Sequence, residues 1–116
     1  MRVMSFYKPA NPPSGPPSAE HMETMGRFAT EMTKKGHLIA AGGFLSAAPV
    51  SASFENGQFG VRENAGAIVP EGFYGFGIIQ AGSNEELMEI VKRFLRVAGD
   101  GECLLHPLME GPPPPQ

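Results

Sequence analysis

The sequence lacks several features that define whole classes of proteins. It holds a single cysteine, Cys103, among 116 residues, so a disulfide within the chain is excluded. No apolar run approaches the roughly 20 residues that a membrane-spanning helix needs. The first seven residues are too short for the apolar part of a secretory signal. We therefore expect a cytoplasmic protein that does not enter a membrane, with Cys103 as a buried structural thiol.

Basic residues are also few. The 9 Lys and Arg are outnumbered by 12 Asp and Glu, which gives a formal net charge of −3. Nucleic-acid binding needs clustered cations to neutralise phosphates, and the short basic groups at 34–35 and 92–96 fit solvated helix faces. The three histidines show no metal-ligand spacing, and the glycines form no nucleotide-binding motif. We expect no nucleic-acid partner, no metal and no cofactor.

Proline is concentrated in two places, around residues 9–17 and at 112–115. Without these stretches the composition is that of an ordinary globular domain, and the length suits one domain. The sequence therefore predicts a single domain over residues 1–110 and a disordered, proline-rich tail over 111–116.

Hydrophobic patterning predicts an alternation of strands and helices. Residues 3–7 alternate with apolar side chains on both faces, as in a central strand. Ser18 is a good N-cap for a helix over 19–35, whose apolar stripe stops at Gly36. Further predicted elements are a strand at 38–45, a hairpin turning at Asn56 and Gly57, a strand at 73–79, a helix from a capping box at Ser83 to Gly99, and a strand at 103–109.

This order predicts an α+β domain of ferredoxin-like, or split βαβ, topology. Both helices then cover one face of an antiparallel sheet. The opposite face carries apolar side chains such as Phe6, Phe44 and Phe76. Because an apolar sheet face of that size needs covering, we expect a homodimer that buries this face.

The chain resembles the YCII-related, or DGPF-domain, family over residues 1–108. The resemblance rests on the order of five features: the opening strand at 1–4, the helix end and strand at 35–45, the aromatic strand at 72–76, the helix start at 83–87, and the final residues 106–108. It implies a dimeric α/β barrel with a pocket between sheet and helices. Family members include proposed enzymes with a His–Asp pair, a protein of chloroaromatic breakdown and proteins that accompany sigma factors.

The sequence departs from this family at two motifs. The position of the proposed catalytic histidine of one subgroup holds Met25, and the Asp-Gly-Pro-Phe signature corresponds to residues 63–66, where it is absent. Neither role is therefore transferred to this chain.

The candidate site lies between the sheet and the first helix. We expect Tyr7 and His106 to converge there as catalytic groups, with Met25, Gly43 and Phe76 binding the ligand. A satisfied sheet histidine is an equally good interpretation of His106.

The other two histidines are ambiguous. His21, in the first turn of the first helix, fits a solvent-facing side chain better than a base at the rim of a pocket. We expect the imidazole of His37 to lie near the last carbonyls of the first helix.

Two functions remain open. One is a cofactor-free lyase or isomerase acting on a small apolar or aromatic substrate. The other is a non-catalytic homodimer that binds a small ligand or has a regulatory role.

Overall fold

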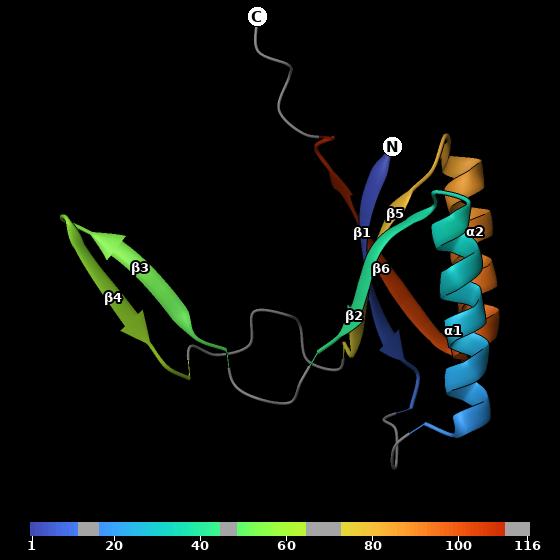
Figure 1. Cartoon of the computed structure of the whole chain (residues 1–116). Helices are drawn as coiled ribbons and strands as arrows, with labels where there is room; N and C mark the ends of the chain where they lie inside the picture. The colour runs from blue at the N-terminus through green and yellow to red at the C-terminus, as the bar shows by residue number, and fades with distance from the viewer. Residues whose placement is uncertain (12–16, 45–48, 65–72, 111–116) are drawn as a thin grey trace, which may run out of the picture.

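The computed structural model describes residues 1–11, 17–44, 49–64 and 73–110 (Figure 1). The proline-rich tail at 111–116 and residues 65–66 of the segment that replaces the family signature lie outside the described residues. The elements are β1 (Arg2–Pro9), α1 (Ala19–Lys34), β2 (Leu38–Gly43), β3 (Ser51–Glu55), β4 (Gln58–Arg62), β5 (Gly75–Gln80), α2 (Asn84–Ala98) and β6 (Gly101–Leu108).

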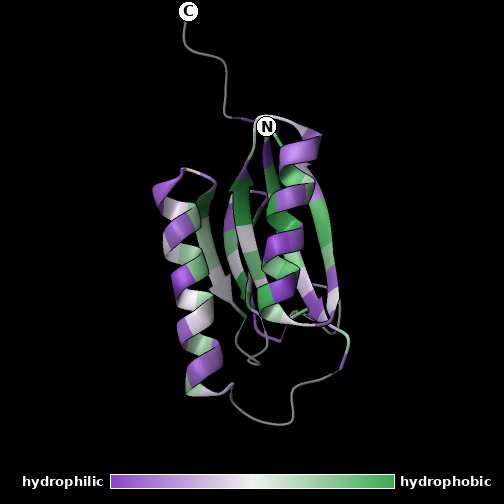
Figure 2. Ribbon diagram, turned by 90° about the vertical axis from the view of Figure 1, so that its right-hand side faces the viewer, coloured by the Kyte–Doolittle hydropathy of each residue, from purple (hydrophilic) through white to green (hydrophobic). Residues whose placement is uncertain are grey.

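Four of the strands form one sheet in the order β2-β5-β1-β6, and every neighbouring pair is antiparallel. The units β1-α1-β2 and β5-α2-β6 therefore interleave. Both helices lie on the same side of the sheet (Figures 1 and 2). The predicted α+β class and antiparallel sheet are confirmed. No barrel is closed by the described part of the chain, and none of its helices has the length and apolarity to cross a membrane.

The helix ends follow the local sequence. The Ser18 hydroxyl accepts a hydrogen bond from the His21 amide at 3.1 Å, which confirms the N-cap of α1. At the other end Gly36 has a φ of 78°. The amides of Gly36 and His37 donate to the carbonyls of Thr33 and Met32, the pattern of a Schellman motif. This turn directs the chain from α1 into β2.

The core lies between α2 and one end of the sheet. Residues at alternate positions on paired strands share a face, so Val3 and the facing Ile79 both point toward the helices. They join Met32 from α1 and four residues that complete the buried cluster: Ala81, Leu87, Ile90 and Val91. Figure 2 shows this apolar sheet behind the two amphipathic helices.

The opposite face of the sheet, here called the outer face, carries an aromatic cluster. Phe6 faces Phe76 across β1 and β5, and Phe44 lies 6.3 Å from Phe6 and 5.6 Å from Phe76 between ring centroids. Phe73 meets Phe6 edge-on at 6.4 Å. The sequence correctly predicted aromatic residues on this face.

The β3-β4 hairpin is separate from this sheet. Asn56 and Gly57 have φ angles of 50° and 76°, the positive values that the predicted type I′ turn requires. Among the described elements, the two strands pack substantially only against each other. Figure 1 shows the hairpin standing off on the outer-face side.

Candidate functional site

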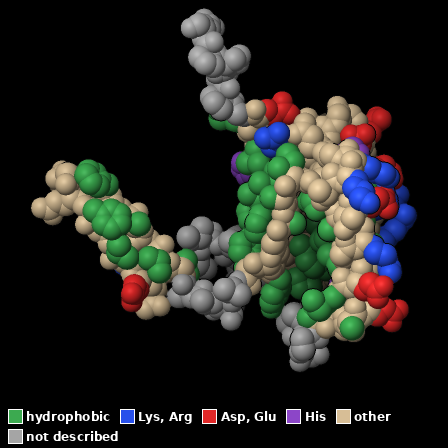
Figure 3. Space-filling view, viewed as in Figure 1, with side chains coloured by type: hydrophobic (Ala, Val, Ile, Leu, Met, Phe, Trp, Pro, Cys, Tyr) green, Lys and Arg blue, Asp and Glu red, His purple; other side chains and the backbone are tan. Residues whose placement is uncertain are grey.

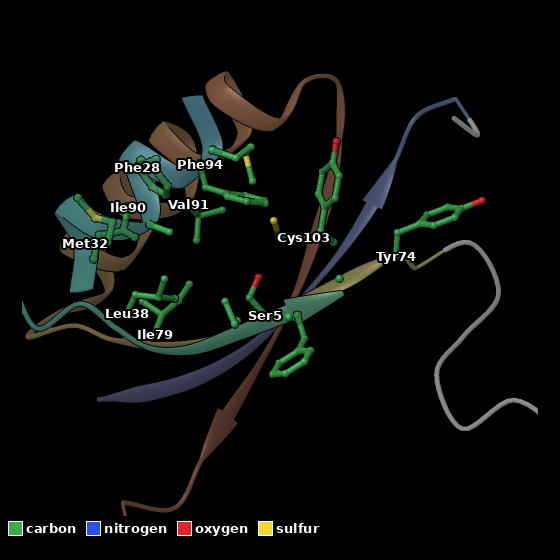
Figure 4. A pocket seen from close by; sticks show the side chains of 18 of the residues that line it. Ser5, Phe28, Met32, Leu38, Tyr74, Ile79, Ile90, Val91, Phe94 and Cys103 are labelled. Carbon is green, nitrogen blue, oxygen red and sulfur yellow. The ribbon is translucent and has the colours of Figure 1, made fainter. Parts of the chain in front are cut away.

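A cavity of about 590 Å³ lies between α1 and the sheet. The space-filling view shows the molecule hollowed between β2 and α1, with apolar side chains inside (Figure 3). Figure 4 shows side chains from both helices facing those from the sheet across this space. The described residues that line it are Ser5, Tyr7, Pro17, His21, Met22, Met25, Phe28, Ala29, Met32, His37, Leu38, Ala41, Gly42, Tyr74, Gly75, Phe76, Gly77, Ile79, Ile90, Val91, Phe94 and Cys103.

Small residues in the sheet create the cavity. At one end of the helix-covered face, large side chains such as Ile79 and Leu38 fill the space under the helices. Further along the same strands, on the same face, β5 has Gly77 and then Gly75, and β2 has Ala41 opposite Gly77. A strand glycine leaves room for a ligand or a close neighbour. Here the side chains of α1 do not fill the space above these small residues, and the cavity remains.

Helix α1 forms the roof of the cavity. Met25, Phe28 and Ala29 line it, and none of them is fully buried. The helix is joined to α2 by Arg93, which donates to the Glu31 carboxylate at 2.6 Å. The guanidinium carbon of Arg93 also lies over the Phe28 ring, 5.6 Å from its centroid. The cavity wall toward α2 is apolar, with Val91 and Phe94 among its residues.

Tyr7 lines the cavity, but its hydroxyl forms hydrogen bonds with the backbone. It donates toward the carbonyls of Gly99 and Asp100 at 3.3 and 3.4 Å, and the ring packs edge-on against Phe94 at 5.3 Å. Burial, together with Cys103 and Asp100, raises the pKa of Tyr7 above its usual value of 10.0. Tyr7 is therefore protonated at neutral pH and forms part of the cavity wall.

Cys103 also faces the cavity, half-buried. Burial raises the pKa of its thiol above the usual 9.0, and a hydrogen bond with Ser5 opposes the rise. Since the thiolate is the nucleophilic form, Cys103 is not activated for nucleophilic chemistry. The sequence led us to expect a buried structural thiol, and the side chain is half-buried in the cavity wall.

Two histidines line the cavity at opposite ends of α1. His21 is half-buried, so the pocket-rim interpretation fits it better than the solvent-facing one. The His37 Nδ1 lies 3.0 Å from the Gln80 carbonyl oxygen and 3.9 Å from a carboxylate oxygen of Glu86. Because a carbonyl only accepts, Nδ1 carries a proton, and the neutral ring has its lone pair on Nε2.

His37 differs from its expected role. Its backbone amide, not its imidazole, satisfies the last turn of α1, and the ring binds β5 instead. The sequence placed His37 directly after the helix stop. The predicted split βαβ topology makes β5 the neighbour of β2, but the register that brings the Gln80 carbonyl to the imidazole could not be found from the sequence.

Of the other predicted site residues, Met25 and Phe76 line the cavity together with Tyr7. Gly43 is not among its lining residues, whereas the adjacent Gly42 is. Phe76 belongs to the outer face and reaches the cavity edge beside Gly42, where a Cβ atom would lie 2.8 Å from the ring. That close approach explains why a glycine stands at position 42.

The structure does not bring His106 to the cavity. His106 pairs with Met4, whose neighbours Val3 and Ser5 point toward the helices, so His106 lies on the outer face. It is exposed, and its Nδ1 lies 2.9 Å from the Pro107 carbonyl oxygen. The expected convergence with Tyr7 is therefore not observed. A strand position wrong by one residue reverses the face.

Within the described residues, no group of three or more His, Cys, Asp or Glu side chains is arranged to hold a metal ion. Comparison with known proteins found no matching family model and no matching curated protein.

Proposed function

We propose that this protein binds a small apolar or aromatic molecule in the cavity between α1 and the sheet. The observation that carries this proposal is the cavity itself, at about 590 Å³ and lined almost entirely by apolar side chains. Small-molecule sites have volumes of roughly 300–1,000 Å³ with a few polar groups among apolar walls. Here the lining residues with polar side-chain groups are Ser5, Tyr7, His21, His37 and Tyr74.

The cavity suits an elongated ligand. Its lining on α1 extends from His21 to Met32, which is about 16 Å along a helix that rises 1.5 Å per residue. A volume of this size spread over that length favours a linked-ring or chain-like molecule over a compact one. The methionines on the roof adapt readily to ligands of different shape.

Catalysis is a second candidate, favoured by the setting of His37. The Gln80 carbonyl accepts from Nδ1 and orients the ring. In the neutral imidazole this leaves the lone pair of Nε2, the group that a general base requires. In a lyase of the dehydrochlorinase type, such a base takes a proton from carbon. The electrons of that C–H bond form a carbon–carbon double bond as chloride leaves the adjacent carbon.

The fold and the partner belong to the same proposal. The strand order and interleaved βαβ units support a ferredoxin-like domain related to the YCII family and the dimeric α/β barrels. The aromatic outer face supports a homodimer, because soluble monomers rarely expose large contiguous apolar patches.

Binding is tested with the neutral fluorescent probe phenylnaphthylamine. Ala29→Phe places a ring in the cavity and should weaken probe binding at least tenfold. Thr30→Phe adds the same ring at the next, exposed position of α1 and should change the affinity less than twofold. Equal affinities of the wild type and Ala29→Phe would contradict binding in this cavity.

The catalytic candidate is tested separately. Small chlorinated and unsaturated aromatic compounds are offered, with chloride release and ultraviolet absorbance as the readouts. His37→Gln should lower the turnover rate roughly 10²–10⁴-fold, the contribution of a general base, while probe affinity is retained. Turnover that survives this change would exclude His37 as the base.

A further inference from the structure

We propose that the β3-β4 hairpin is a dimerisation arm whose apolar face packs on the outer sheet face of a second copy of this chain. This inference rests on the proposed homodimer and names the segment that holds the two copies together.

The hairpin has one apolar and one polar face. Phe54 pairs with Phe59 and Ala52 pairs with Val61, so these four side chains lie on the same side. Phe54, Phe59 and Val61 are 74%, 69% and 58% exposed. The opposite side carries the polar residues Ser51, Ser53, Glu55, Gln58 and Arg62, with Gly60 between them. This amphipathic pattern is that of a hairpin with one buried face.

Nothing among the described elements of its own chain supplies that burial. The hairpin packs substantially on no other described element, and Figure 3 shows its apolar side chains in the open. An isolated two-stranded hairpin is at best marginally stable in water. Two exposed phenylalanines would make such a hairpin prone to association.

The outer face of the sheet is the complementary surface on the same chain. It presents the cluster of Phe6, Phe44 and Phe76, with Met4 and Ile78 paired beside them on the same face. Leu104, which faces Phe6 from β6, is 50% exposed. Hairpin and sheet thus each lack a cover that the other can provide.

The areas fit a pair of chains. Two phenylalanines of about 200 Å² each, exposed as above, leave roughly 300 Å² on the hairpin. Four strands spaced 4.8 Å apart and about 20 Å long offer roughly 400 Å² of sheet. The sum, about 700 Å² per copy, approaches the 800 Å² per partner of a standard interface.

A second copy of the chain covers more of the outer face than the hairpin would if it folded back on its own sheet. Two strands span only about half the width of four, so one hairpin leaves the rest of its own outer face exposed. In a twofold pair each copy gives one hairpin and one sheet face, and the two remaining halves of the sheets meet each other.

The experiment measures dimer dissociation by sedimentation equilibrium for four full-length proteins. Phe54→Gln changes the apolar hairpin face, and Ser53→Gln is its matched control on the adjacent polar position. Leu104→Gln changes the outer face of the sheet. We expect a wild-type dimer at micromolar concentration, at least tenfold weaker dimerisation for Phe54→Gln and Leu104→Gln, and a change under twofold for Ser53→Gln. Circular dichroism is used to check whether each variant remains folded.

Other outcomes separate the arm from the dimer itself. If Leu104→Gln dissociates while Phe54→Gln remains a wild-type dimer, the arm is wrong and the sheet-face homodimer stands. A wild-type monomer refutes both, and the hairpin then folds back on its own sheet or binds another protein. If a variant unfolds, Phe59→Gln replaces it for the hairpin and Ile78→Gln for the sheet, with the same expectations. Probe binding in the cavity is measured in parallel, because it does not depend on these faces.

Discussion

The two halves of the helix layer differ in how they meet the sheet. Helix α2 buries Leu87, Ile90 and Val91 almost completely, whereas Met32 is the one fully buried residue of α1. Both helices are capped by serine and both are amphipathic, so the difference does not come from the helices alone. It comes from the strands beneath them. The tight half gives the domain its stability, and the loose half leaves the space in which a ligand is proposed to bind.

The strands under α1 carry small residues where a core would need large ones. Gly75, Gly77 and Ala41 lie below the first half of α1, while Val3 and Ile79 lie at the other end of the sheet. A methionine above a glycine contacts few atoms, and a void costs the lining side chains their dispersion contacts. The chain thus forgoes stability at this position, and a bound apolar ligand would restore it.

The largest expected difference is between core truncations in the two halves. Leu87→Ala removes a side chain that is 4% exposed and should cost about 2–5 kcal/mol. Met25→Ala removes a half-buried side chain beside an existing cavity and should cost less than about 1 kcal/mol. Urea denaturation of both variants measures the gap. Equal losses would mean that α1 packs as tightly as α2.

The sequence predicted only part of the structure that separates the two halves. The capping residues Ser18 and Ser83, the helix stop at Gly36 and the hairpin turn at Asn56 are local signals, and each was located correctly. These signals depend on neighbours within a few residues, which a sequence displays directly.

Strand pairing could not be seen in the same way. The positions of His106 and Gly43 depend on register between strands far apart in the chain, and a shift of one residue exchanges the faces. The cavity likewise arises because glycines of β5 lie next to small residues of β2. The predicted topology makes these strands neighbours, but their register, which is interrupted between Leu38 and Ala40, could not be predicted from either segment.

A second prediction concerns filling the floor of the cavity. A Cβ atom at Gly77 would lie 3.5 Å from the nearest side-chain atom of Leu38, an ordinary contact. Gly77→Ala should therefore stabilise the unliganded protein by up to about 1 kcal/mol. Gly77→Val should weaken phenylnaphthylamine binding about tenfold, because its methyl groups occupy the floor.

Gly26 on the exposed side of α1 provides the matched control. Apart from the adjacent residues and the backbone of its own helix, no atom lies within 4 Å of a Cβ at that position. Gly26→Ala should give a similar gain of about 0.5–1 kcal/mol from helix propensity, with probe affinity unchanged. If both glycine changes alter the affinity equally, the floor of the cavity is not where the probe binds.

A third, smaller effect is expected from Cys103. Its raised pKa means that the folded protein holds the thiol proton more tightly than the unfolded chain. The resulting stability is complete below the unfolded value near 9.0 and is lost as pH rises through the folded value. Alkylation by iodoacetamide should be slow at pH 7.5, accelerate above pH 9 and slow again when the probe is bound.

Tyr7 also titrates at high pH, with its pKa raised above 10.0, so the two groups need separating. In the Cys103→Ala variant only Tyr7 of the two groups remains. The decline of unfolding free energy should therefore begin about one pH unit higher in this variant than in the wild type. An unchanged onset would assign the alkaline decline to Tyr7 or to groups outside the cavity.

The smallest expected effect lies at the contact between the two halves. The Glu31 carboxylate accepts hydrogen bonds from Arg93 of α2 at 2.6 Å and from Lys35 at 3.1 Å, and these cations hold its pKa below the usual 4.5. A lowered folded pKa stabilises the protein above the unfolded value, and this contribution disappears as pH falls through the folded value. Glu31→Gln should therefore flatten the decline of unfolding free energy below pH 4.5. The effect is small because the pair is solvent-accessible and screened by salt.

Glu23→Gln breaks a similar 3.0 Å pair with Arg27 that lies within α1 alone, and it should leave probe affinity unchanged. If the Glu31 contact positions α1 over the cavity, Glu31→Gln alone weakens probe binding, by about twofold at low salt and less at high salt. Identical probe affinities in the two variants would show that the roof of the cavity is held by its apolar contacts with α2 and not by this ion pair.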